Sequence, residues 1–328
     1  MDTTQLDTTS PCILVTGALG QIGSELVEAL RARYGTERVL ASDIRQPDLA
    51  AGSFHQLDVT DRSALLDLVQ REGITQIYHL AAILSAKGEQ NPTLAWDINM
   101  SSLLNVLEVA RQTAVERIFW PSSIAVFGPQ APKDGTPQQT ITDPTTVYGI
   151  SKLAGERWCA YYHAKYGVDV RSIRYPGLIG YQGLPGGGTT DYAVEMFHAA
   201  LREGHYSSFL APDSALPMLF MPDAIRGTIE LMEAPAGCIR VRDAYNLQGL
   251  TFAPAELARA IEAERPGFAC TYAPDFRQAI ADSWPARLDD TAARQDWGWQ
   301  PAHDLQAMTQ EMLREVKARF FQPVGATG

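Results

Sequence analysis

Short apolar runs alternate with longer amphipathic segments along the first half of the chain. The predicted strands are Cys12–Thr16, Arg38–Ser42, Phe54–Leu57, Gln76–Leu80 and Arg117–Trp120. The predicted helices between them are Gly20–Arg33, Ser63–Glu72 and Ile98–Gln112. The first run is continuously apolar, which is typical of a strand buried on both faces. Strands that alternate with helices in this way predict an α/β protein with a parallel sheet covered by helices.

The second half begins with one long predicted helix, Val147–Tyr166, and a sixth predicted strand, Val168–Arg174. The alternation breaks up beyond Pro176, and the Gly-rich segment Gln182–Gly188 predicts a loop. Later predicted elements are a strand at Tyr245–Leu247 and helices at Ala224–Glu233, Pro254–Glu264 and Leu305–Arg319. This pattern favours a Rossmann-like, doubly wound parallel sheet with a smaller C-terminal lobe, and a substrate bound between the two.

The net charge of the chain indicates which classes of molecule it is expected to bind. The chain has 328 residues, of which 38 are acidic and 27 basic, and its net charge is −11. Nucleic-acid binding depends on cationic side chains that displace counterions, so this balance argues against a nucleic-acid partner. No stretch approaches the ~20 apolar residues that a membrane span needs, and the polar start of the chain does not resemble a signal peptide. We therefore expect no membrane partner.

The spacing of cysteines and histidines bears on compartment and metal binding. The four cysteines are scattered along the chain without a CxxC pair. This usage predicts reduced thiols and a cytoplasmic location. The six histidines form no HxxH or HExxH pattern, so their local spacing predicts no metal site.

Three glycines follow the first predicted strand with the spacing GxxGxxG, at Gly17, Gly20 and Gly23. Such glycines permit a tight turn and let the main chain approach a pyrophosphate, while the next helix offers its free N–H groups. The spacing alone is weak, because an ordinary glycine-rich turn would explain it. Its position between an apolar strand and an amphipathic helix favours a dinucleotide site.

A carboxylate at the end of the second predicted strand indicates which dinucleotide binds. Asp43 lies twenty residues beyond Gly23, where it can accept both adenosine ribose hydroxyls and would repel a 2′-phosphate. This favours NAD over NADP, although Arg45 could tolerate a phosphate. The predicted cofactor-binding residues are Gly17, Gly20, Gln21, Ile22, Gly23, Asp43, Ile44, Arg45, Asp58, Val59, Leu80, Ala81, Ala82, Asn99, Tyr148, Lys152, Tyr175 and Leu178.

Candidate catalytic residues start the long helix. Tyr148 and Lys152 are four positions apart and therefore share one helix face. A nearby ammonium, together with a positive nicotinamide ring, would favour the phenolate and make it a usable general base. Ser122 and Ser123 end the fifth predicted strand, where a hydroxyl could hold the reacting oxygen. Tyr161 and Lys165 repeat the spacing, but roughly 20 Å further along the helix and away from the expected ligand edge.

This combination resembles the extended short-chain dehydrogenase/reductase family. The resemblance implies that the serine, tyrosine and lysine act as assigned, and the family's usual serine-to-tyrosine separation favours Ser123 over Ser122. It further implies that the lysine binds the nicotinamide ribose and that Asn99 is a structural asparagine. It also implies an NAD-binding domain (residues 1–176 and 217–247), a smaller substrate-binding lobe (177–216 and 248–328), and a homodimer formed through the helices around Ser101–Gln112 and Ser151–Tyr166.

Further segments are similar to the short-chain-type L-threonine 3-dehydrogenases, a branch of that family. They are Leu84–Gly88, Arg174–Ile179, Pro185–Ala193, Leu216–Ala224 and Asp275–Pro285. The similarity implies oxidation of L-threonine to 2-amino-3-oxobutyrate with reduction of NAD. The predicted substrate-binding residues are Ser85, Ser123, Tyr148, Gly187, Thr189, Thr190, Asp191 and Trp284.

The chemistry of the Gly-rich loop agrees with an amino-acid substrate but does not select threonine. Its main-chain N–H groups and the Thr189 and Thr190 hydroxyls could bind a carboxylate, and Asp191 could pair with an ammonium group. A flexible surface turn, and a core position for Trp284, would explain the same residues. A nucleotide-sugar epimerase or dehydratase of the same family is the main alternative, and a catalytically idle NAD-binding regulator is another.

Overall fold

The computed structural model describes residues 10–47, 52–184 and 188–321. Their contacts divide the chain into two compact units. The first unit consists of the described residues up to Pro121, with Ala154–Ser172 and Leu231–Ala244. The second unit consists of Ser122–Leu153, Ile173–Glu230 and the described residues from Tyr245 onward.

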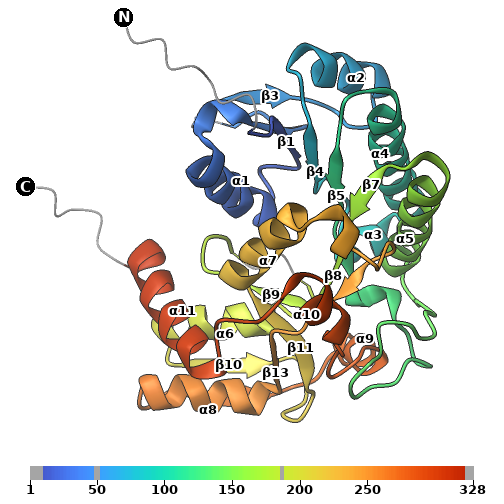
Figure 1. Cartoon of the computed structure of the whole chain (residues 1–328). Coiled ribbons are helices and arrows are strands. Elements are labelled where there is room, and N and C mark those ends of the chain that lie inside the picture. The colour runs from blue at the N-terminus through green and yellow to red at the C-terminus, as the bar shows by residue number, and fades with distance from the viewer. Residues whose placement is uncertain (1–9, 48–51, 185–187, 322–328) are drawn as a thin grey trace, which may run out of the picture. The chain divides into compact units, whose positions relative to one another are not determined.

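A six-stranded parallel sheet forms the centre of the first unit, in the order β3-β2-β1-β4-β5-β7. Its strands are β1 (Ile13–Thr16), β2 (Val39–Asp43), β3 (Phe54–Gln56), β4 (Gln76–His79), β5 (Arg117–Phe119) and β7 (Asp169–Arg171). Its helices are α1 (Gln21–Tyr34), α2 (Arg62–Arg71), α3 (Ser85–Gln90), α4 (Pro92–Gln112) and most of α5 (Val147–Tyr166). Figure 1 shows α1 on one side of the sheet and α2 and α4 on the other. This strand order confirms the predicted Rossmann-like α/β fold.

Smaller sheets and a helical layer build the second unit. The sheets are β12-β8-β6, β13-β11-β9 and β10-β14. Their strands are β6 (Ser122–Ser123), β8 (Ile173–Tyr175), β9 (Gly177–Ile179), β10 (His205–Ser208), β11 (Leu216–Phe220), β12 (Tyr245–Asn246), β13 (Leu250–Phe252) and β14 (Ala269–Tyr272). The helices are α6 (Tyr192–Arg202), α7 (Met221–Glu233), α8 (Pro254–Glu264), α9 (Arg277–Ser283), α10 (Thr291–Trp297) and α11 (Leu305–Phe320). Phe197, Leu257 and Met312 join α6, α8 and α11 in one core.

Two predicted strands are wrong in their extent. Val168–Arg174 is not one strand: β7 pairs with β5 in the large sheet, whereas β8 pairs with β6 and β12 in another sheet. The fifth predicted strand likewise ends at Phe119, and Ser122–Ser123 form the separate strand β6. Pro121 explains both breaks, because it lacks the N–H that would continue the ladder beyond the bond from Trp120 N to Arg171 O.

Two helices begin earlier than predicted. The helix predicted from Ile98 begins at Pro92, where Asn91 caps it by accepting the Leu94 N–H and proline occupies the first turn. The helix predicted from Ala224 begins at Met221, directly after β11. The helix α6 was not predicted, although its sequence is amphipathic: seven of its eleven residues are buried, whereas Glu195, Ala199 and Arg202 are less buried.

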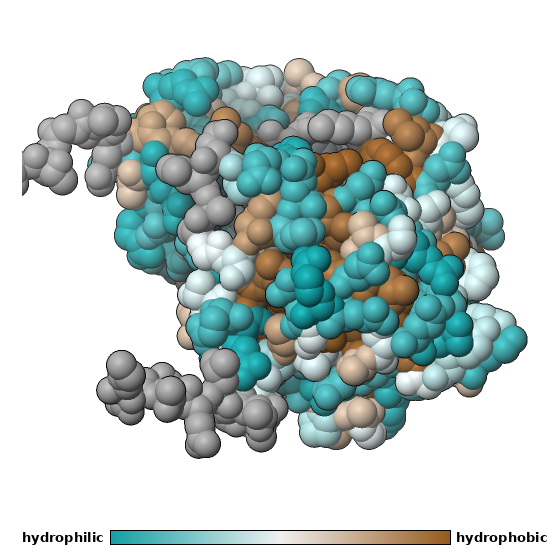
Figure 2. Space-filling view, turned by 90° about the horizontal axis from the view of Figure 1, so that it is seen from above, coloured by the Kyte–Doolittle hydropathy of each residue, from teal (hydrophilic) through white to brown (hydrophobic). Residues whose placement is uncertain are grey.

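The surface mixes polar and apolar side chains. Figure 2 shows apolar side chains in groups between hydrophilic ones on the face that it presents. Such grouping is ordinary, because a folded protein has too little polar surface to cover itself. Across the part of the chain that the structure describes, no helix is both long enough and apolar enough to cross a membrane.

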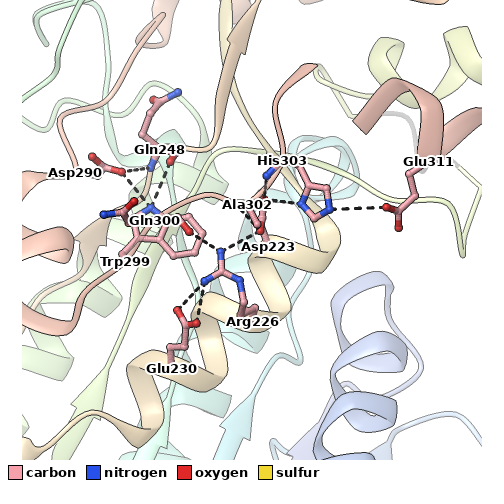
Figure 3. Close-up of polar contacts among 10 residues, drawn as sticks. All are labelled: Asp223, Arg226, Glu230, Gln248, Asp290, Trp299, Gln300, Ala302, His303 and Glu311. Carbon is pink, nitrogen blue, oxygen red and sulfur yellow. Dashed lines mark hydrogen bonds and ion pairs between the residues drawn. The ribbon is translucent and has the colours of Figure 1, made fainter. Parts of the chain in front are cut away.

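A buried carboxylate holds the C-terminal segment of the second unit on α7. Asp223 is 2% exposed and accepts hydrogen bonds from Arg226, from the Ala302 and His303 main-chain N–H groups and from His303 Nδ1 (Figure 3). Arg226 in turn lies over the Trp299 ring, whose indole N–H donates to Asp290 at 3.1 Å. The network therefore joins α7 to the chain between α10 and α11.

Removing this carboxylate is expected to destabilise the second unit. An Asp223→Ala variant leaves the Ala302 and His303 main-chain N–H groups without their acceptor and removes one of the acceptors of Arg226, which keeps Glu230 and the Gln300 C=O. The expected cost is about 2–3 kcal/mol in the free energy of unfolding. Urea unfolding measures the loss. The exposed pair Arg287–Asp134 is the control, since Asp134→Ala should change stability by less than about 1 kcal/mol. Equal stability of the two variants would contradict the role given to Asp223.

Candidate active site

The predicted glycine turn lies at the carboxyl end of β1 and brings main-chain segments into contact. Gly17 has φ +71°, and a Cβ there would lie 2.6 Å from Ala81 N and 2.9 Å from Leu80 C. A Cβ on Gly23 would lie 2.3 Å from Gly17 O. Only glycine fits either position, because the obstacles are main-chain atoms that cannot turn aside. The first and third glycines therefore fix the shape of the turn.

The second glycine leaves the start of α1 open. Gly20 is the N-cap of α1, and neither a side-chain cap nor an acidic residue of the first turn occupies this end of a helix that the structure describes completely. Gln21 and Ile22 begin the helix, so the N–H groups of the first turn are directed beyond it. These groups and the helix dipole fit a diphosphate.

Asp43 ends β2 beside this turn. Its side chain accepts the Leu19 N–H at 3.1 Å, the Arg45 N–H at 3.1 Å and Arg45 Nε at 3.0 Å. Burial opposes the charged form, but the hydrogen bonds from Arg45 and Leu19 outweigh it and hold the pKa of the Asp43 carboxyl below its usual value. The group is therefore an anion at neutral pH, and it fits the two hydroxyls of an adenosine ribose.

Neutralising Asp43 is expected to weaken NAD binding selectively. An Asp43→Ala variant loses the acceptor for both ribose hydroxyls, so the Kd for NAD should rise about 10- to 100-fold, or ~1.4–2.8 kcal/mol. The Kd for NADP should rise less or fall, because the repelling charge is gone while Arg45 stays. Calorimetric titration with both cofactors measures the ratio. An equal loss for NAD and NADP would contradict the assignment.

Other predicted cofactor residues in the first unit have structural contacts. Asp58 accepts the Thr60 N–H and hydroxyl in a local turn, and Val59 is buried in the core. Asn99 binds both the N–H and the C=O of Ile83. It thereby holds the segment that follows Leu80–Ala82, while Ile44 is exposed next to Asp43. Their contacts with a cofactor stay predictions.

The catalytic candidates come together in the second unit. Ser123 ends β6, and Tyr148 and Lys152 lie in the first two turns of α5. Lys152 Nζ is 5.5 Å from the centre of the Tyr148 ring, and Ser123 is hydrogen-bonded to the phenol. Burial raises the pKa of Tyr148 to about 12, and the Ser123 hydrogen bond opposes this rise. The Tyr148 phenol of the free protein is therefore protonated at neutral pH, and it becomes a base only with additional positive charge.

The second Tyr–Lys pair provides a contrast on the same helix. Lys165 Nζ donates to the Tyr161 oxygen at 2.8 Å, and this hydrogen bond lowers the pKa of the phenol. Tyr161 is 43% exposed and lies thirteen residues beyond Tyr148. A phenol that water surrounds cannot hold a substrate hydroxyl in a dry site, so acidity alone does not make Tyr161 a candidate.

The predicted substrate loop is partly described. Gly187 lies outside the described residues. Asp191 accepts the Gly188 N–H at 2.8 Å, Thr189 is buried, and Thr190 packs so closely on Gly177 that a Cβ there would lie 2.7 Å from Thr190 Cγ2. These residues are ordered by the start of α6 and by β9, so this part of the loop has a defined conformation.

The other predicted cofactor- and substrate-binding residues lie in different elements of the structure. Ser85 begins α3 in the first unit, and Leu178 lies in β9. The Tyr175 phenol is buried and hydrogen-bonded to the Thr228 hydroxyl, and burial raises its pKa. Trp284 packs against two hydrophobic clusters of the second unit, which agrees with the core alternative.

The sequence analysis missed two residues beside Tyr148. Thr146 caps α5, since its hydroxyl accepts the Gly149 N–H at 3.1 Å and its C=O accepts the Ile150 N–H. A threonine three positions before a glycine at a helix start is a recognisable cap signal. Gly149 is buried against Ala125, a contact that no local pattern predicts.

Known proteins share this architecture over nearly the whole chain. The NAD dependent epimerase/dehydratase family model matches residues 13–247. An uncharacterized epimerase/dehydratase of Staphylococcus haemolyticus is 48% identical over 312 residues, which are 94% of this chain and 98% of that protein.

Solved structures are similarly close. The holo form of a GalE-like L-threonine dehydrogenase from Cupriavidus necator has a TM-score of 0.92 and 57% identity, and the match covers 94% of this chain and 100% of that one. A monomeric L-threonine 3-dehydrogenase from a metagenome, in its apo form, has a TM-score of 0.90 and 48% identity over 93% of this chain and 99% of that one. The chain described here belongs to the NAD-dependent epimerase/dehydratase family.

Proposed function

We propose that the protein oxidises L-threonine to 2-amino-3-oxobutyrate and transfers the hydride to NAD. The observation that carries this proposal is the group formed by Ser123, Tyr148 and Lys152 at the start of α5. We infer the substrate from solved L-threonine dehydrogenases, which are 57% and 48% identical to this chain over nearly its whole length. The glycine turn fits the diphosphate of a dinucleotide, and the Asp43 carboxylate favours NAD over NADP.

Each member of the group has a distinct task. Bound NAD supplies the hydride acceptor and a positive charge. With the positive charges of Lys152 and of bound NAD beside it, the Tyr148 phenol would first lose its own proton to solvent. The phenolate Oη then takes the proton from the hydroxyl of threonine, and Lys152 keeps positive charge beside it during this transfer. The Ser123 hydroxyl donates a hydrogen bond to the Tyr148 oxygen and keeps that oxygen in line with the hydroxyl of the substrate.

A direct assay tests the proposal. Purified protein with NAD and L-threonine should produce NADH at 340 nm, and L-allo-threonine, L-serine and UDP-sugars serve as comparison substrates. NADH formation with L-threonine is the expected result. A change of a UDP-sugar without net NADH would instead identify an epimerase. NADH formed only with an alcohol that is not an amino acid would contradict the substrate.

We further propose a homodimer in the cytoplasm, with α4 and α5 as the contact. Aromatic side chains support this proposal: Trp158, Tyr161 and Tyr166 are each 39–44% exposed and pack on one another along α5. Because a related L-threonine 3-dehydrogenase is monomeric, the oligomeric state of this protein is the quantity to measure. Light scattering should give about twice the mass of 35.9 kDa, and Trp158→Glu should return the monomer.

A further inference from the structure

The main chain of Ala125 contacts Ser123 with its N–H group and Gly149, the residue after Tyr148, with its carbonyl group. Its N–H donates to Ser123 Oγ at 3.2 Å, at the start of the short 3₁₀ turn Ile124–Val126. Its carbonyl oxygen faces Gly149, the residue after Tyr148, so closely that a Cβ on Gly149 would lie 2.1 Å away. Ala125 itself is 3% exposed. One peptide segment thus links the serine to the helix that carries the tyrosine.

The fit at Gly149 is enclosed on a second side. Its Cβ would also lie 2.8 Å from Pro144 Cβ and 3.1 Å from Ala125 C. The same segments meet again at Gly128, where a Cβ would lie 1.9 Å from Asp143 O. Main-chain atoms and a proline ring cannot rotate away, so any side chain at residue 149 must push α5 off the 3₁₀ turn.

We propose that Gly149 is a positioning residue that sets the Ser123–Tyr148 separation, by letting α5 rest directly on the Ala125 peptide. The proposal rests on the proposed function, in which this pair handles the proton of the substrate. The Ala125 N–H occupies a lone pair of Ser123 Oγ, which leaves the hydroxyl proton for the Tyr148 oxygen. The Thr146 cap holds the same end of the helix through the Gly149 N–H.

A displacement of α5 should change the acid limb of the pH profile of kcat/KM. Because the Ser123 hydrogen bond lowers the pKa of Tyr148, its loss raises that pKa. The phenol must be deprotonated to accept the substrate proton, so the acid limb of kcat/KM moves to higher pH. Gly149→Ala should show this shift together with a fall in kcat of about 10- to 100-fold. Ser123→Ala should shift the limb in the same direction.

Gly155 offers a matched control six residues along the same helix. A Cβ there would lie 2.3 Å from Trp120 Cη2 and 3.0 Å from Leu103 Cδ2, so its obstacles are side chains. Gly155→Ala should therefore lower Tm while kcat stays within about twofold and the acid limb stays unchanged. A double-mutant cycle adds a second criterion: in a Ser123→Ala background, Gly149→Ala should cost little further activity.

A cofactor-free measurement separates this proposal from the proposed function. Incorporated 3-fluorotyrosine gives a ¹⁹F signal for Tyr148, assigned by its absence in Tyr148→Phe. We expect Gly149→Ala to shift this signal in the direction of Ser123→Ala, and Gly155→Ala to leave it in place, whether or not L-threonine is oxidised. Thr146→Val removes the cap hydroxyl with only a small change in side-chain size. It should produce a smaller shift of the same sign, and it replaces Gly149→Ala if that variant does not fold. An unmoved Tyr148 signal in these variants would overturn the proposal.

Discussion

Replacing Tyr148 with phenylalanine is expected to lower kcat for L-threonine by about 100- to 10,000-fold. The substitution removes one oxygen atom and keeps the ring over which Lys152 Nζ lies at 5.5 Å. The start of α5 therefore stays packed, and NAD should bind with a Kd within about threefold of the original, because the turn that holds it lies in the other unit. Steady-state kinetics and NAD titration measure both quantities.

Tyr161→Phe is the matched control for this variant. It removes the same atom from the exposed Tyr–Lys pair of the same helix. We expect its kcat to stay near the original value. Near-normal turnover of Tyr148→Phe, or an equal loss in Tyr161→Phe, would contradict the assignment of the base.

Replacing Gly17 with alanine is expected to remove NAD binding and to destabilise the first unit. A non-glycine residue at φ +71° costs about 1–2 kcal/mol. The collision of its Cβ with Ala81 N and Leu80 C adds about 1–3 kcal/mol, because the turn must separate from the end of β4. We expect the Kd for NAD to rise more than about 100-fold, since the turn no longer presents its N–H groups together.

The Gly73→Ala variant measures what a side chain at positive φ costs in stability when its Cβ meets no obstacle. Gly73 has φ +61°, and among the described residues no heavy atom lies within 4 Å of its Cβ position. Its substitution should cost about 1–2 kcal/mol and leave NAD binding unchanged. Thermal unfolding and NAD titration compare the two variants. If Gly17→Ala binds NAD as well as Gly73→Ala does, the turn is not the cofactor cradle.

Local signals predicted the first unit well. The apolar run and the glycines that follow it predicted β1 and the turn into α1 from a few neighbouring residues, because a buried parallel strand and a tight turn have fixed chemical requirements. The role of Asp43 in cofactor binding stays a prediction. The length of α5 was also predicted correctly, at Val147–Tyr166. The confirmed fold class follows from these signals.

Non-local contacts explain what the sequence could not predict. The split between β7 and β8 depends on Pro121, which lies between the neighbouring strands β5 and β6 and is 50 residues earlier than Arg171. The contact between Gly149 and Ala125 and the burial of Asp223 depend equally on distant partners. The raised pKa of Tyr148 could not be predicted from the sequence either, because it results from burial, which is a property of the folded chain.

The fate of the hydrogen on the β-carbon of threonine shows whether the protein transfers a hydride from threonine to NAD. L-Threonine with deuterium at this carbon is incubated with the protein and NAD, and the reduced cofactor is analysed by mass spectrometry. We expect one deuterium in each NADH formed and a slower rate than with unlabelled substrate. NADH without deuterium, or consumption of threonine without any NADH, would contradict this hydride transfer.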